Sequence, residues 1–127
     1  MKNIIKSGLV LLIVLIAGCN KEPAIEPSAE FSVNKTTLEV QESFVIYTDK
    51  LQGEWASYFK GNDSTTTYSK DFYRAKGTPI DLDLDSVSVS AYNFPGEYSF
   101  TVVASSSGNW AEEYLQDVKS VTITVEE

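Results

Sequence analysis

The strongest strand signal in the chain is the run Glu97-Tyr98-Ser99-Phe100-Thr101-Val102-Val103-Ala104. Its aromatic and aliphatic side chains recur at every second position from Tyr98 to Ala104. Because successive side chains of a strand point to opposite faces, this spacing predicts a strand with one face in a core. Pro95 and Gly96 come directly before it and are typical of a tight turn.

Shorter stretches with the same period lie on both sides of this run. We expect strands at residues 31–33, 38–40, 43–48, 54–59, 71–75, 80–91 and 121–125. In the sixth of these, alternation is strict from Ile80 to Asp85 and resumes after Ser86 with Val87, Val89 and Ala91. Residues 105–109 predict a loop, and 110–118 predict an extended excursion or a single helical turn. Seven or eight short strands separated by turn residues predict an all-β, antiparallel two-sheet sandwich.

A short apolar segment precedes the strand-rich region. Lys2 and Lys6 form a basic head, an apolar run follows, and the small residues Ala17 and Gly18 stand directly before Cys19, the only cysteine. These three parts predict a secretory signal. A transmembrane anchor with an incidental cysteine is the alternative. The apolar run disfavours it, because it falls short of the ~20 residues that a spanning helix needs.

With Cys19 in this position, the segment resembles the signal of a bacterial lipoprotein. The resemblance implies cleavage before Cys19, a thioether-linked diacylglycerol on its sulfur and usually a third acyl chain on the new amine. We therefore expect a signal peptide at 1–18, a lipidated tether at 19–30 and a sandwich domain at 31–127. The expected location is the outer membrane, on its periplasmic or extracellular face.

Charge restricts the classes of partner. The 127-residue chain has 10 basic and 18 acidic residues, and since Lys2 and Lys6 lie in the signal, the remainder keeps 8 basic and 18 acidic residues, a net charge of −10. Such a surface suits neither nucleic acid nor anionic headgroups, so we expect membrane attachment through acyl chains alone. The sequence contains no histidine, the commonest general base and zinc ligand.

The second half of the chain carries a more specific pattern. It combines the turn Phe94-Pro95-Gly96, the strand opening Glu97-Tyr98 and the closing strand Val121-Thr122-Ile123-Thr124-Val125. This pattern resembles a PKD domain, an immunoglobulin-like sandwich, within a lipoprotein of the kind found in gut Bacteroidota. The resemblance implies that Trp55 is a buried core tryptophan and that the Tyr98 hydroxyl reaches the backbone, as in a tyrosine corner. The residues after Trp55 lack the usual order of the family.

Three alternating acids, Asp81, Asp83 and Asp85, form a conspicuous cluster. On a strand their carboxylates would share one face, which would suit Ca²⁺. As an EF-hand loop the stretch fails, because Ser86 replaces the expected glycine and Tyr92 the expected glutamate. The favoured interpretation is a half-buried strand with its leucines inward, so we expect no metal and no cofactor.

Aromatic residues beside the loops give the best functional hypothesis. Planar rings stack on sugar faces and anchor protein interfaces. The candidates for ligand binding are Trp110, Tyr114, Tyr73 and Tyr68. The alternative is that Trp110 and Tyr114 only cover the open end of the sandwich, and Tyr58 is assigned more strongly to packing.

The function expected from the sequence is therefore a non-catalytic surface lipoprotein that binds a polysaccharide or a partner protein. The alternative is a structural accessory subunit of a cell-envelope or polysaccharide-utilisation complex, whose edge strand extends the sheet of a partner. An enzyme is disfavoured, because no histidine and no Gly-x-Ser-x-Gly nucleophile motif occur in the sequence.

Overall fold

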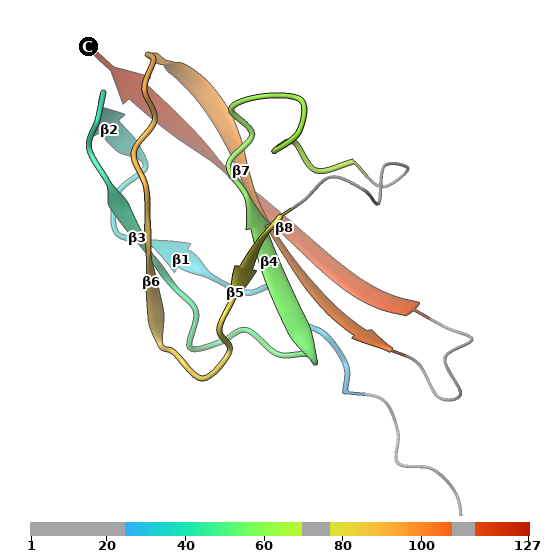
Figure 1. Ribbon diagram of the computed structural model, residues 1–127. Coiled ribbons are helices and arrows are strands. Elements are labelled where there is room, and N and C mark those ends of the chain that lie inside the picture. Colours follow the sequence, from blue (N-terminus) through green and yellow to red (C-terminus); the bar gives the residue numbers. More distant parts are fainter. Residues whose placement is uncertain (1–24, 70–76, 108–113) are drawn as a thin grey trace, which may run out of the picture.

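The structure is a computed structural model that describes residues 25–69, 77–107 and 114–127 (Figure 1). These residues form eight strands: β1 (Ser32–Val33), β2 (Thr37–Glu39), β3 (Phe44–Tyr47), β4 (Trp55–Phe59), β5 (Thr78–Ile80), β6 (Ser86–Val89), β7 (Gly96–Ser107) and β8 (Tyr114–Glu126). The described part of the chain contains no helix, and so none that could cross a membrane. The predicted all-β class is confirmed.

The strands divide into two sheets, as expected for a sandwich. One sheet has the order β1-β3-β6 and the other the order β2-β8-β7-β4-β5. All pairings are antiparallel except that of β2 with β8, which is parallel. The prediction of a purely antiparallel sandwich was therefore wrong at this edge, because the chain changes sheets between β1 and β2.

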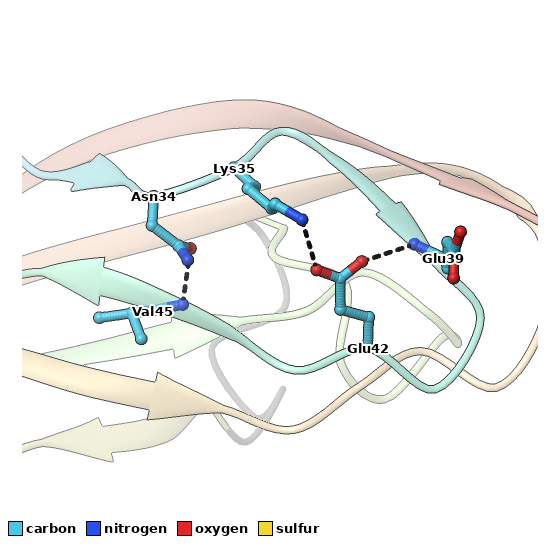
Figure 2. A network of polar contacts seen from close by, with 5 residues as sticks. All are labelled: Asn34, Lys35, Glu39, Glu42 and Val45. Atoms are coloured by element: carbon cyan, nitrogen blue, oxygen red, sulfur yellow. Dashed lines mark hydrogen bonds and ion pairs between the residues drawn. The ribbon is translucent and has the colours of Figure 1, made fainter.

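A small polar network holds this change of sheet (Figure 2). Asn34 completes the β1 pairing, because its side-chain oxygen accepts a 2.9 Å hydrogen bond from the Val45 amide. Two residues later, the Thr36 carbonyl accepts the Thr124 amide at 2.8 Å, which begins the pairing with β8. Glu42 braces the corner through a 2.8 Å ion pair with Lys35 and a 3.0 Å hydrogen bond from the Glu39 amide.

Aromatic rings from both sheets meet in the core. Phe100 of β7 is fully buried, and its ring centroid lies 5.4 Å from that of Phe44 on β3 in an edge-to-face contact. The Tyr58 ring of β4 stacks on Phe100 at 5.3 Å, and Phe31 approaches it at 5.9 Å. Such ring pairs add about 0.5–1.5 kcal/mol each beyond their burial, so they lock the two sheets together without a disulfide.

The predicted strand at 80–91 was wrong in its middle. Residues 81–85 form a turn that joins β5 in one sheet to β6 in the other. The Asp81 carboxylate accepts the Asp83 amide at 2.9 Å, and the Asp81 carbonyl accepts the Leu84 amide at 3.2 Å. Aspartate side chains compete for backbone amides in this way, which breaks a strand.

Two further predictions were wrong near the end of the chain. Ser105, Ser106 and Ser107 lie in β7 rather than in a loop, and residues 114–118 lie in β8 rather than in an excursion. The register pairs each residue from Gly96 to Ser107 with a partner on β8. The complete ladder of the hairpin therefore overrides the loop preference of the serine run. The predicted strand at 71–75 lies outside the described residues.

The folded body begins before Phe31. Ser28 and Gln52 exchange backbone hydrogen bonds of 2.9 and 3.0 Å. Ala29 is fully buried, and its amide donates a 2.7 Å hydrogen bond to the Asp117 carboxylate. The last residues of the predicted tether, 28–30, are thus attached to the sandwich. Cys19 and the signal peptide 1–18 lie outside the described residues.

Candidate binding face

The outer side of the five-stranded sheet carries the exposed aromatic group. In β4, Ala56 and Tyr58 belong to the core, so Trp55 points to the opposite side of the sheet. The Trp55 side chain is 40% exposed. The prediction of a buried Trp55 was wrong, because strand alternation decides the side and outweighs the preference of a large ring for the core.

Register shows what lies beside Trp55. Trp55 pairs with Ser105 on β7, and Ser105 pairs with Gln116 on β8. Because residues directly opposite share a face, these three side chains form one row across the sheet. In the next row Val103 pairs with Val118, which is 40% exposed. With strands about 4.8 Å apart, the row from Trp55 to Gln116 is roughly 10 Å wide, about the size of two sugar rings.

Tyr68 approaches this row from the segment that follows β4. Its ring packs against the Phe59 ring at 5.5 Å, and its hydroxyl donates a 3.4 Å hydrogen bond to Oε1 of Gln116. Gln116 in turn donates from Nε2 to Ser105 Oγ at 3.5 Å. Trp55, Tyr68, Gln116 and Val118 together form what we call the outer face, and the buried Ser105 lies between Trp55 and Gln116. The outer face combines aromatic surface with side-chain hydrogen-bonding groups.

The base of the outer face is well packed. Phe59 and Val103 are 7% and 5% exposed, although neither belongs to the main core cluster. Gly77 lies directly over Phe59, so closely that a Cβ there would come within 2.8 Å of the ring. The chain after β4 therefore folds back onto the sheet at both of its described ends, Tyr68 and Gly77.

The start of this returning segment is fixed by a polar turn. Asp63 accepts hydrogen bonds from the hydroxyl and amide of Thr65 and from the amide of Thr66. These bonds, with that of the Thr65 hydroxyl strongest, lower the pKa of the Asp63 carboxyl. Gly61 adopts a left-handed φ of 72°, and its amide bonds to the Thr66 carbonyl at 3.0 Å. This turn therefore fixes the backbone shortly before Tyr68.

The other residues predicted for ligand binding are placed only in part. The backbone of Tyr114 pairs with Ser107 at the start of β8. Trp110 and Tyr73 lie outside the described residues. The sequence did not point to Gln116 or to an exposed Trp55. The alternation of Ala56 and Tyr58 was the signal that could have placed Trp55 outside.

The three aspartates of the predicted cluster do not gather their carboxylates on one face. Asp81, Asp83 and Asp85 are exposed residues of a turn and do not share the face of a strand. Across the described ranges, no three His, Cys, Asp or Glu side chains come together in a way that could hold a metal ion. The weak Ca²⁺ candidate therefore has no structural support.

Comparison of the chain with models of known protein families and with curated proteins finds no match.

Proposed function

We propose that the protein is a lipid-anchored, non-catalytic binding module of the outer membrane that holds polysaccharide on the outer face. The observation that carries the proposal is the 40% exposed Trp55 on the same side of the sheet as Gln116, which bonds to Tyr68. Indole and phenol rings present flat apolar surface to the C–H face of a sugar. Gln116 and the Tyr68 hydroxyl offer hydrogen bonds to its hydroxyl groups.

The finer fold belongs to the same proposal, an immunoglobulin-like sandwich of PKD type. Two observations support it. The pairing of β3 with β6 and the neighbours β4-β7-β8 correspond to the B–E and C–F–G pairings of that fold. The Tyr98 hydroxyl donates a 2.6 Å hydrogen bond to the Phe94 carbonyl four residues upstream, which is the geometry of a tyrosine corner. Phe100, two residues after Tyr98, stands at the usual position of the second cysteine and packs on Phe44 instead.

The test is retention on insoluble polysaccharides, with the full mature chain and single variants. We expect Trp55→Ala to reduce retention about tenfold or more, as for a central aromatic anchor. Trp110→Ala tests whether the ring predicted from the sequence contributes to the same site. Tyr47→Ala is the matched control, because Tyr47 is similarly exposed at 43% but lies on the other sheet. Absence of retention on every polysaccharide, or equal loss with Tyr47→Ala, would contradict the proposal.

The edge of the three-stranded sheet favours the accessory-subunit alternative. In the described part of the chain, β6 pairs only with β3 and ends its sheet. An exposed strand edge is a template for the strand of a partner. If the protein is not retained on polysaccharide but co-purifies with an envelope protein, and a proline at Ser88 abolishes this, the alternative replaces the proposal.

A further inference from the structure

The most exposed large apolar side chain among the described residues lies away from the outer face. Phe94, in the connection from β6 to β7, is 73% exposed. Pro95, its neighbour, is also exposed. A single exposed apolar residue is common on protein surfaces and by itself indicates nothing. The surroundings of Phe94 are what distinguish it.

The backbone that carries Phe94 is held on both sides. After it, the Tyr98 hydroxyl donates a 2.6 Å hydrogen bond to the Phe94 carbonyl oxygen. Before it, Tyr92 is buried, its ring stacks on Tyr98 at 4.2 Å, and its carbonyl accepts the Gln41 amide at 2.9 Å. A ring presented on a fixed backbone loses little conformational freedom on binding, which is the property of an interface anchor.

Acidic residues surround this end of the sandwich. Register places Gly96 opposite Val125 and Glu39 opposite Glu126, so both glutamates and Glu97 lie close to the Phe94 turn. A shallow depression at the same end is lined by Lys35, Thr37, Leu38, Glu39, Glu42 and Glu126. Two lysines at this end bond to groups of the same chain. Lys35 pairs with Glu42 at 2.8 Å (Figure 2), and Lys60 donates to the Ala91 carbonyl at 2.9 Å.

This end also lies far from the point where the N-terminal segment joins the body. Ala29 bonds to Asp117, which pairs with Ala104, whereas Phe94 stands just before Gly96. Ala104 and Gly96 are eight residues apart on β7, so the two points are separated by roughly 26 Å along the strand. The β6–β7 connection accordingly lies at the C-terminal end of the molecule, and the chain enters at the other end (Figure 1).

We propose that this end is a docking surface for a basic protein, which receives Phe94 in an apolar pocket ringed by lysine and arginine side chains. Charge complementarity selects this occupant, because a cationic rim would pair with Glu39, Glu97 and Glu126. A second copy of the chain would bring like charges together. An anionic lipid surface would be repelled for the same reason. The surface is separate from the outer face and does not depend on polysaccharide binding.

The experiment uses the full-length chain with a photo-crosslinking phenylalanine analogue at position 94, and at position 47 as control. We expect position 94 alone to crosslink to one protein with a basic surface. With that protein purified, Phe94→Ser and the pair Glu97→Lys, Glu126→Lys should each weaken binding about tenfold or more. Raising salt from about 0.05 to about 0.5 M should weaken binding of the unmodified chain.

The pair Asp83→Lys, Asp85→Lys is the charge-matched control, since both aspartates are exposed between β5 and β6. It should leave binding unchanged, and thermal unfolding should show that Phe94→Ser is folded. Crosslinks to lipid, to polysaccharide or to a second copy would overturn the inference. So would an absence of crosslinks, or binding that is insensitive to Phe94→Ser or to salt. Retention on polysaccharide is read separately, so either proposal can fail alone.

Discussion

The Lys60 ammonium group lies 4.6 Å from the centroid of the Tyr92 ring, while the Tyr92 hydroxyl donates a 2.9 Å hydrogen bond to the Lys60 carbonyl oxygen. The two residues thus hold each other through a cation–π contact and a hydrogen bond. Lys60 directly follows β4, and Tyr92 lies in the connection to β7. Lys60 begins the segment that leads to Tyr68, and Tyr92 stands two residues before Phe94. The pair therefore joins the start of the Tyr68 segment to the start of the Phe94 turn.

The first prediction concerns alkaline unfolding. Burial raises the pKa of the Tyr92 phenol above its ordinary value of 10. Above pH 10 the unfolded chain therefore loses the Tyr92 proton more readily than the folded chain. Tyr92 contributes stability that is fully present below pH 10 and is lost as the pH rises toward its folded pKa. Urea unfolding between about pH 10 and 12 should show a falling free energy of unfolding.

The control for this prediction is Tyr92→Phe. At neutral pH it should cost about 1 kcal/mol, because the Lys60 carbonyl loses its donor. Burial lowers the pKa of Lys60. The folded protein therefore loses this charge at a lower pH than the unfolded chain, which raises the free energy of unfolding as the pH approaches 10.5. Above pH 10.5 that contribution ends, and the difference in slope between the wild type and Tyr92→Phe reports the contribution of Tyr92. An identical slope in the wild type and Tyr92→Phe would contradict the prediction.

The second prediction concerns Gly61. Its φ of 72° lies in the left-handed region, and a Cβ there would collide with the carbonyl oxygen of Ser99. An alanine pays about 1–2 kcal/mol for the backbone conformation alone, and the collision adds to it. We expect Gly61→Ala to lower the free energy of unfolding by more than about 2 kcal/mol in urea titrations. Ser64→Ala, in the same exposed loop, should change it by less than about 0.5 kcal/mol. Equal effects of the two variants would refute this account.

The third prediction concerns the attachment of the N-terminal segment. The Ala29 amide is buried and bonds to the Asp117 carboxylate at 2.7 Å. Asp117→Ala leaves this donor without its acceptor, which costs about 1–3 kcal/mol locally. Hydrogen exchange of the Ala29 amide should accelerate about tenfold or more, while core amides of β7 change less. Asp117→Asn keeps an oxygen acceptor and should retain most of the protection. Unchanged exchange in Asp117→Ala would show that the segment is held by other contacts.

The sequence predicts this fold well where local pattern and long-range pairing agree. The strand around Phe100 follows from period-two alternation, and the bond from the Tyr98 hydroxyl to the backbone was expected at the turn before it. The prediction failed where local pattern and long-range pairing conflict. Residues 81–85 alternate like a strand, but Asp81 bonds to its own turn, and Leu84 is 49% exposed. Ser105 and Ser106 resemble a loop, but they are buried because β8 pairs with them along its whole length.

The binding face could be predicted only in outline. Tyr68 was expected beside a loop, and its contact with Gln116 depends on a partner 48 residues away that no local pattern reveals. Trp55 was assigned to the core because the resemblance to a PKD domain implies a buried tryptophan there. Tyr58 stacks on Phe100 in the core. Because side chains alternate along β4, this contact places Trp55 on the opposite side of the sheet.

The last prediction tests the anchor. A diacylglycerol on Cys19 with a third acyl chain would hold the protein at a membrane, since two or more chains suffice for stable attachment at about 0.8 kcal/mol per buried CH₂ group. We expect protein extracted from membranes to begin at residue 19 and to exceed its polypeptide mass by a lipid-sized increment. Cys19→Ser should lose this increment. Adding Ala24→Cys to Cys19→Ser restores a thiol without the preceding Leu15-Ile16-Ala17-Gly18, so lipidation should stay absent. A native chain that begins at Met1, carries no lipid and occurs only in the cytosol would refute the anchor, while the fold and the surface around Phe94 would stand unchanged.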